Sequence, residues 1–333
     1  MKRSQTTSPL FIVGAPRSGA SVLRHTLALH PHIYFPPDSA VLPQFVLQRP
    51  HSPLRRREVS DLLEAVLDDT RHRGQRWEGP PPRPGALMRA MARRTEHPTG
   101  AMLLDTLYRT YARRQHASRW GDQTPLYTRH VILLNRLFPQ SQFIHVIRDG
   151  RDVALSLLVG DERPQEGAPL SAVELYAAAR VWRETVRSAQ RAGRRLGRDR
   201  YFEIYYEDLV RVPNVELRQL CHFLGEPFLP QLVEQPRLVN DWLLGENHFR
   251  PFTGDPQPAT VEQWRERMAP EDVRLFQLVA GATLRRAGYQ RVEGSPPTLV
   301  ERVRVKLLAG RWRAARSRRR LLRALAPLFT RLK

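Results

Sequence analysis

A run of four apolar residues that ends in a glycine-bounded turn constrains this chain more than any other feature. Residues 10–13 are Leu-Phe-Ile-Val, which is typical of a buried strand, and the turn from Gly14 to Gly19 leads into an apolar-periodic run from Val22 to Leu29. A tight turn between a strand and a helix directs several backbone N–H groups at one point, where the helix dipole also favours negative charge. The sequence therefore predicts an anion-binding loop.

The cation of this loop lies at an unusual position. The spacing from Gly14 to Gly19 matches the first half of a nucleotide P-loop, but Ala20 occupies the place where a phosphate-binding lysine should follow. Arg17 supplies positive charge from inside the loop instead, with a guanidinium that can grip a phosphate or a sulfate. This pattern disfavours an ATP or GTP hydrolase. The alternative is an ordinary strand-to-helix turn with a surface arginine, because glycine-bounded turns are common.

The positive charge of the chain is unevenly distributed. The formal net charge of the 333 residues is +21, and residues 291–333 contain thirteen Lys or Arg against two Glu, so about half of the charge lies in this tail. The remainder is spread thinly over residues 1–290, which suits a protein that handles anions and is too diffuse for a nucleic-acid groove. We therefore expect no nucleic-acid partner.

Cysteine usage and the N-terminal residues bear on the compartment. The single cysteine, Cys221, cannot form an internal disulfide and belongs to no metal-ligand cluster that the sequence reveals, so we expect a reducing compartment and no metal. The N-terminal residues do not resemble a signal peptide, and no apolar run approaches the length of a membrane span. These features predict a cytoplasmic protein.

The order of the elements predicts the fold class. Further strands are expected at 33–35, 143–147 and 201–205, with helices at 54–73, 86–94, 101–116, 127–138, 153–158, 172–196 and 214–224. Strands that alternate with helices favour an α/β fold with a parallel sheet and helices on both faces. Residues 119–125 are expected to form a turn-rich break. The domain division predicted is a catalytic domain at 1–290 and a tail at 291–333.

The exit of the strand at 143–147 is the second candidate site. Arg148 ends this strand and Ser156 lies roughly two turns into the following helix, so a guanidinium and a hydroxyl are available for a second phosphate. The alternative is that Arg148-Asp149 and Arg151-Asp152 are surface charge pairs, which contribute little to stability.

The motifs together resemble those of the sulfotransferases that use 3′-phosphoadenosine-5′-phosphosulfate (PAPS), and most closely a bacterial branch similar to tyrosylprotein sulfotransferases. The resemblance covers roughly residues 8–290, and the specificity lies in the ordered combination. The motifs are Gly14-Ala-Pro-Arg-Ser-Gly19, Arg148-Asp-Gly-Arg-Asp-Val-Ala-Leu-Ser156, Tyr206-Glu-Asp-Leu-Val210, His222-Phe-Leu-Gly-Glu-Pro227 and Gln263-Trp-Arg265.

This resemblance implies a P-loop-like sulfotransferase fold and transfer of a sulfuryl group from PAPS to a hydroxyl or phenol acceptor, with 3′-phosphoadenosine-5′-phosphate (PAP) as the product. It implies that the 5′-phosphosulfate lies against Arg17 and the backbone of Ser18, Gly19, Ala20 and Ser21. It also implies that Arg148 and Ser156 hold the 3′-phosphate and that Thr260 and Arg265 lie near the nucleotide. The acceptor is expected to be a small molecule, a glycan or a peptide.

Several positions depart from the family pattern. Related proteins carry a Pro-Pro-Glu-Thr segment where this chain has Pro36-Pro37-Asp38-Ser39, so Asp38 is the candidate base, one methylene shorter. Gln123 replaces a lysine that would offset charge on the leaving phosphate, and Ala20 replaces a threonine. Losing one such donor typically costs about a hundredfold or more in rate. The alternatives are therefore a PAPS- or PAP-binding protein with little turnover and, more remotely, a small-molecule kinase.

The tail has its own predicted role. Apolar residues with arginines around them fall on one helical face, and such a segment can lie on an anionic membrane, although Pro327 is expected to interrupt the helix. The alternative is a solvated basic tail. The apolar residues are Leu321, Leu322, Leu325, Leu328, Phe329 and Leu332.

Overall fold

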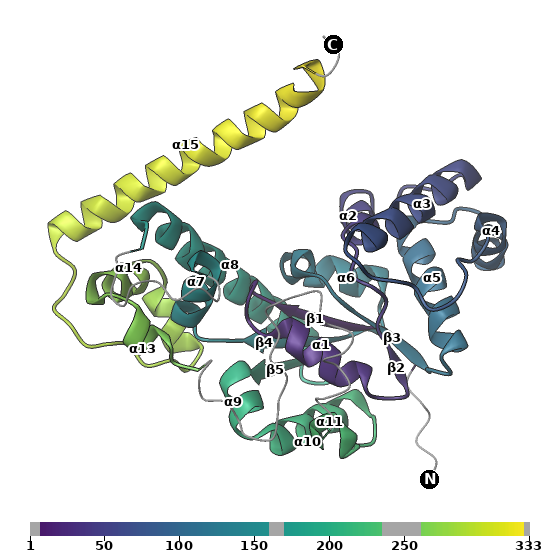
Figure 1. Ribbon diagram of the computed structural model, residues 1–333, viewed down its shortest axis with the longest axis horizontal. Coiled ribbons are helices and arrows are strands. Elements are labelled where there is room, and N and C mark those ends of the chain that lie inside the picture. Colours follow the sequence, from purple (N-terminus) through teal and green to yellow (C-terminus); the bar gives the residue numbers. More distant parts are fainter. Residues whose placement is uncertain (1–6, 160–169, 235–260, 330–333) are drawn as a thin grey trace. The chain divides into compact units, whose positions relative to one another are not determined.

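The computed structural model describes residues 7–159, 170–234 and 261–329, with side chains described up to residue 315. The chain packs as two compact units. The first contains residues 1–148 and 187–258, and the second contains residues 149–186 and 259–333. The first unit holds every described strand, and the second is helical (Figure 1).

The first unit is built on a five-stranded sheet in which all strands run parallel, as the sequence predicts (Figure 1). The spatial order is β2-β3-β1-β4-β5. The chain therefore runs from β1 to β2 and β3 on one side of β1, and then crosses to β4 and β5 on the other side. The strands are β1 (Leu10–Gly14), β2 (Ile33–Tyr34), β3 (Arg119–Gln123), β4 (Gln142–Ile147) and β5 (Tyr201–Tyr205).

The β1 strand is apolar on both faces because both faces are covered. Phe11 lies in an aromatic cluster with Trp120, Tyr127 and Phe143, with ring centroids 5.3 to 5.5 Å away. This cluster belongs to the core formed with helices α2 to α6. The alternate residues of β1 point to the opposite face, and α1 packs against β1 and β3. Helices thus flank the sheet as expected.

The helices of the first unit follow the predicted ranges closely. They are α1 (Ala20–Ala28), α2 (Val41–Gln48), α3 (Arg56–His72), α4 (Pro84–Ala92), α5 (Gly100–Arg114), α6 (Val131–Leu137), α9 (Tyr206–Arg211), α10 (Pro213–Leu224) and α11 (Gln231–Glu234). Helices α2, α9 and α11 were not predicted. Cys221 is buried in α10.

The prediction of a turn-rich break at 119–125 was wrong for residues 119–123. Residues 119–123 form β3, which pairs with both β1 and β2. Glycine and aspartate are poor strand formers, so the local sequence gave no strand signal. Burial of Trp120 and pairing on both sides override that preference. The expected helix at 127–138 is likewise divided into the 3-10 helix η1 (Pro125–Arg129) and α6.

The second unit consists of helices α7 (Gly150–Leu158), α13 (Trp264–Arg267), α14 (Pro270–Arg286) and α15 (Leu299–Phe329), together with most of α8 (Ala172–Leu196). Gly150 lies so close to Trp182 and Phe276 that an added Cβ would come within 2.5 and 2.6 Å of their rings. The α15 helix continues past Pro327, where an interruption was expected. Among the described residues, no helix combines the length and the apolarity needed to cross a membrane.

Candidate functional site

Three loops of the first unit leave the sheet at the same edge. The register pairs Gly14 with Val146 and Ile147 with Tyr205, so β1, β4 and β5 end side by side. The residues that follow these ends are the glycine-bounded loop, Arg148 and Tyr206. Ligands of parallel sheets bind at the carboxyl ends of the strands, between two neighbouring strands whose following connections run in opposite directions. Here these strands are β1, which is followed by β2 on one side, and β4, which is followed by β5 on the other.

The loop at 14–19 has the backbone of an anion cradle. Arg17 and Gly19 adopt left-handed φ values of 67° and 89°, and Gly19 is the N-cap of α1 without a side-chain cap. The first N–H groups of α1, at Ala20 and Ser21, therefore lack a side-chain cap at the positive end of the helix dipole. The buried Ser18 hydroxyl has no hydrogen-bond partner among the described residues. Unsatisfied donors of this kind suit a bound anion.

Gly14 and Gly19 have to be glycines, because other groups of the protein approach them closely. A Cβ at Gly14 would lie 2.5 Å from the Ser18 Oγ and 2.8 Å from the Val146 carbonyl oxygen. A Cβ at Gly19 would fall on the Tyr206 ring, and the positive φ there adds strain for any other residue. Tyr206 therefore packs directly on the loop. The sequence analysis did not assign Tyr206 to the site, because only its place after a strand marked it.

Arg148 reaches the loop from the neighbouring strand. One of its terminal N–H groups donates to the Arg17 carbonyl oxygen at 3.1 Å, and its guanidinium stacks over the Tyr206 ring at 4.7 Å. Arg148 is half-buried, whereas Arg17 is exposed. The structure thus brings Arg17 and Arg148, 131 residues apart in sequence, to one place.

Gln123 lies beside the helix start as well. Its side-chain oxygen accepts a hydrogen bond of 3.4 Å from the Ser21 hydroxyl. The preceding residue, Asp122, is buried and accepts a 2.7 Å hydrogen bond from Tyr127. Burial raises the pKa of Asp122 to about 6. The position where relatives carry lysine is therefore next to the cradle, and a neutral amide occupies it.

Asp38 is held by an arginine on α1. The Arg24 guanidinium donates to the Pro36 carbonyl oxygen at 2.6 Å and pairs with one Asp38 carboxylate oxygen at 2.9 Å. The Asp38 N–H donates to the Gln75 side-chain oxygen. The Arg24 side chain is 9% exposed and that of Asp38 is 41% exposed, so the carboxylate is fixed from inside and open to solvent. The sequence analysis missed Arg24, which reads as an ordinary helix residue.

Asp38 and Arg24 also influence neighbouring titratable groups. The charges of Arg24 and Asp38 both act on the pKa of Asp122, the neighbour of Gln123. They also act on His25, whose pKa is lowered to about 4, mainly by burial and next by Arg24. His25 is therefore neutral at neutral pH. Arg17 and Arg148 are the cations that the structure shows at the cradle itself.

Ser156 and Arg265 belong to the second unit. Ser156 lies on α7 and is partly buried. Arg265 is exposed on α13, pairs with Glu262 at 3.3 Å and stacks over Trp264 at 4.6 Å. Trp264 is buried. Thr260 lies outside the described residues.

The acidic and basic residues that follow Arg148 are not surface charge pairs. Asp149, Arg151 and Asp152 are each at most 3% exposed. Arg151 forms two hydrogen bonds with Asp149, at 3.0 and 2.6 Å, and Asp152 accepts the backbone N–H groups of Glu262 and Trp264. These contacts fix α13 on α7, so the surface-pair alternative fails for these residues.

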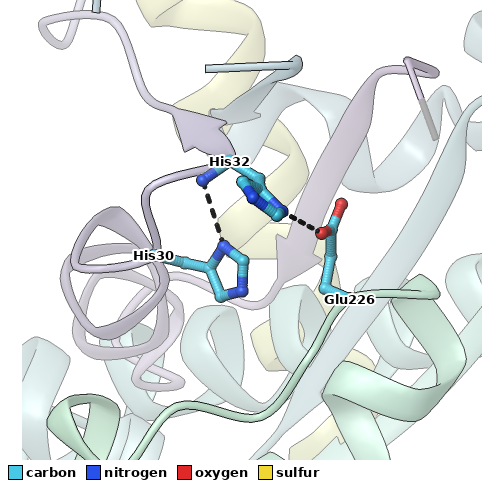
Figure 2. Close-up of side chains that lie close together, drawn as sticks. All are labelled: His30, His32 and Glu226. Atoms are coloured by element: carbon cyan, nitrogen blue, oxygen red, sulfur yellow. Dashed lines mark hydrogen bonds and ion pairs between the residues drawn. The ribbon is translucent and has the colours of Figure 1, made fainter. Parts of the chain in front are cut away.

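A second polar cluster in the first unit contains His30, His32 and Glu226 (Figure 2). Their possible ligand atoms lie within 4.8 Å of one another, and Glu226 is about 195 residues away in sequence, so sequence analysis missed the set. The backbone N–H of His32 donates to His30 Nδ1 at 3.2 Å. The Nε2 of His30 therefore donates to the Pro227 carbonyl oxygen at 3.1 Å.

Both nitrogens of His30 are therefore occupied. Glu226 also faces the fully buried Arg119, 3.8 Å away, whose charge it balances, and accepts from His32 at 2.8 Å. An added divalent cation would compete with that arginine. We therefore interpret the cluster as a structural contact between the turn after α1 and the turn after α10.

The fold and the cradle define a class of protein. A parallel sheet with a glycine-bounded loop, uncapped helix N–H groups and a buried serine hydroxyl without a partner among the described residues suits an anionic ligand, and an arginine of the neighbouring strand exit is hydrogen-bonded to this loop. These features fit a phosphorylated nucleotide with more than one anionic group. The described residues therefore fit PAPS.

Comparison with known proteins gives the family. The sequence model of the sulfotransferase family matches residues 9–230. A protein-tyrosine sulfotransferase A of Caenorhabditis elegans is 21% identical over 87% of this chain and 70% of its own length. An omega-hydroxy-beta-dihydromenaquinone-9 sulfotransferase of Mycobacterium bovis is 27% identical over 48% of this chain and 44% of its own length.

A solved structure agrees with the fold. The sulfotransferase domain of the Synechococcus PCC 7002 olefin synthase has a TM-score of 0.50 and 25% identity, and the match covers 83% of this chain and 96% of that domain. The chain belongs to the sulfotransferase family. Its reaction is the transfer of a sulfuryl group from PAPS to a hydroxyl acceptor, which confirms the predicted activity and cosubstrate.

Proposed function

We propose that the loop at 14–21 and Arg148 bind PAPS and that Asp38 removes the proton of the acceptor hydroxyl. The hydrogen bond from Arg148 to the Arg17 carbonyl oxygen carries this proposal, because it joins two strand exits in one cation-lined site. The Tyr206 ring supports the positions of the loop and of Arg148, since it packs on Gly19 and under the Arg148 guanidinium.

Each part of the cradle has a separate task. When bound, PAPS supplies a sulfuryl group attached to a phosphate leaving group. Arg17, with the hydroxyl of Ser18 and the backbone N–H groups of Gly19, Ala20 and Ser21, stabilises the charge that develops on this phosphate. Such transfers depend mainly on positioning and charge stabilisation, which fixed backbone dipoles provide without rearrangement.

The 3′-phosphate is assigned to Arg148. Its guanidinium is oriented by the Arg17 carbonyl oxygen and by stacking on Tyr206, and a guanidinium is suited to bind a phosphate group. We include Ser156, Thr260 and Arg265 in the nucleotide site on the strength of the motifs that contain them.

Asp38 fits the role of a general base in two respects. One carboxylate oxygen is paired with Arg24, which fixes the orientation of the group, and the side chain remains 41% exposed for an acceptor. A base must lie within hydrogen-bond reach of the proton that it takes, so a fixed carboxylate at an open edge is suited to this task.

The acceptor is proposed by chemical class only. The two relatives named above are called protein-tyrosine and menaquinone sulfotransferases, so hydroxyl groups of peptides and of small molecules both occur in the family. We propose a small-molecule, glycan or peptide hydroxyl for this chain and no nucleic-acid partner.

Location and domain organisation follow the sequence analysis. We propose a cytoplasmic protein, since its single cysteine is buried and reduced, with a catalytic domain at 1–290. The basic tail at 291–333 would add a peripheral contact with an anionic membrane.

The test of this function is a calorimetric titration with PAP. We expect saturable binding of one PAP per chain, and competition by PAPS but not by ATP, because the cradle lacks the P-loop lysine. A chain that is indifferent to PAP would contradict the proposed site. Competition by ATP would favour the kinase alternative.

Gln123 favours a second candidate, a PAPS- or PAP-binding protein with little turnover. Its neutral amide lies beside Ser21 where relatives carry lysine. If the chain is a competent enzyme, wild type transfers labelled sulfate from PAPS to some member of a panel of phenols, sugars and tyrosine peptides, and Gln123→Lys changes the rate only moderately. Activity that appears only in Gln123→Lys, with PAP affinity retained in both, would support the binding protein.

A further inference from the structure

The first half of α15 presents an apolar stripe to solvent. Leu299 and Val300 are each 77% exposed, Leu307 is 64% exposed and Val303 is 45% exposed. Large apolar side chains with this exposure are rare elsewhere, since the described residues contain nine and four of them lie within residues 299–307. Exposed apolar side chains that lie together mark an interaction surface more often than scattered ones do.

The opposite face of α15 is already occupied within the second unit. Leu308 is 5% exposed, Glu301 binds Arg274 with hydrogen bonds of 2.8 and 3.0 Å, and Trp312 lies under the Arg180 guanidinium at 4.2 Å. These residues are spaced as one side of a helix. The docking of α15 therefore fixes which side remains outward, and an added Cβ at Gly310 would meet open space there.

Basic residues border the stripe on both sides. At about 100° per residue, Arg302, Lys306 and Arg313 fall on one side of it, and Arg304 and Arg311 fall on the other. All five are exposed. The acidic residue of this half of the helix, Glu301, faces inward and is neutralised by Arg274.

We propose that this surface, formed by Leu299, Val300, Val303 and Leu307 with their five flanking basic residues, binds an anionic lipid bilayer. Apolar side chains enter the boundary between headgroups and acyl chains, while arginine and lysine stems extend to the lipid phosphates. A second copy of the chain fits less well, because pairing two stripes would bring the basic borders of both copies together. This proposal deepens the membrane contact proposed above and does not depend on the sulfotransferase assignment.

The surface continues in the sequence. Positions seven apart return to within about 20° on a helix, and the series Val300, Leu307 and Ala314 extends to Leu321 and Leu328. The side chains of the last two lie outside the described residues, so the test uses the described part of the helix.

The test is co-sedimentation of the full chain with vesicles. We expect recovery with phosphatidylcholine vesicles that contain about one third phosphatidylserine, little recovery with phosphatidylcholine alone, and loss of recovery at high salt. The variant Leu299→Gln, Val303→Gln, Leu307→Gln should bind at least about tenfold more weakly, because its apolar stripe is removed. Arg302→Gln, Lys306→Gln should lose preference for the anionic vesicles.

Control variants carry the same kinds of substitution elsewhere in the chain. Val212→Gln, Val215→Gln replaces comparably exposed apolar residues of the first unit, and Arg57→Gln, Arg113→Gln removes the same charge. Equal recovery of the stripe variant and its control, or equal binding of wild type to neutral and anionic vesicles, would overturn the proposal. Self-association without vesicle binding, abolished by the stripe variant, would replace it with an interface between copies. PAP affinity should be unchanged in every variant, which separates this outcome from that of the nucleotide site.

Discussion

Replacing Asp38 with Asn is expected to lower the rate of sulfuryl transfer by about a hundredfold to ten-thousandfold, the range that general base catalysis contributes. The amide cannot take a proton, but its oxygen still accepts from Arg24, so the Pro36–Asp38 segment keeps its place. The measurement is transfer of labelled sulfate from PAPS to an acceptor that wild type sulfates, with PAP affinity determined on the same sample.

The control for this change is Asp68→Asn on α3. Asp68 is 48% exposed, and its pair with Arg71 lies on the helix surface, so the same loss of charge should leave the rate within about twofold. Transfer at the wild-type rate by Asp38→Asn would show that another group takes the proton. A parallel loss of PAP affinity would indicate instead that Asp38 supports the loop.

Replacing Arg148 with Ala is expected to weaken PAP binding about tenfold to a hundredfold. Hydrogen bonds to charged groups contribute about 1.5 to 3 kcal/mol each, and about 1.4 kcal/mol corresponds to a factor of ten in affinity. The variant also removes the donor to the Arg17 carbonyl oxygen and the stack on Tyr206, so part of the loss would come from a looser loop. Calorimetry with PAP measures the affinity.

Two further variants separate charge from geometry. Arg148→Lys keeps the charge but loses the planar fork and the stacked guanidinium, so its affinity should fall between those of wild type and Arg148→Ala. Arg113→Ala removes an exposed arginine at the end of α5, which precedes β3 and so lies at the opposite edge of the sheet from the cradle. Unchanged PAP affinity in Arg148→Ala would remove this residue from the nucleotide site.

Local patterns were sufficient for the strands and loops nearest the site. The apolar run of β1, the glycine spacing after it and the buried strand β4 each depend on residues close in sequence, and all three agree with the structure. The β3 strand could not be recognised in this way. Its residues are weak strand formers, and the neighbours β1 and β2 that stabilise it lie about 85 to 110 residues earlier in the chain.

The contacts of the site residues could not be predicted from the sequence either. Nothing local indicates that Tyr206 packs on Gly19, that Arg24 holds Asp38 or that Asp152 accepts the N–H groups of residues 262 and 264. The charged run after Arg148 illustrates the difference. Its pattern is compatible with a solvated surface, and only burial by distant elements makes Asp149, Arg151 and Asp152 structural.

The sequence by itself determined that this chain has a parallel α/β sheet, an anion-binding loop with arginine in place of the P-loop lysine, and the motifs of a sulfotransferase. These properties depend on side-chain periodicity, turn residues and their order, which are local. Only the tertiary structure decided that Arg148 joins the loop at Arg17, that Arg24 fixes Asp38 and which face of α15 remains outward. Such contacts arise when the strands align in register and the helices bury their apolar faces, and they join residues that are remote along the chain.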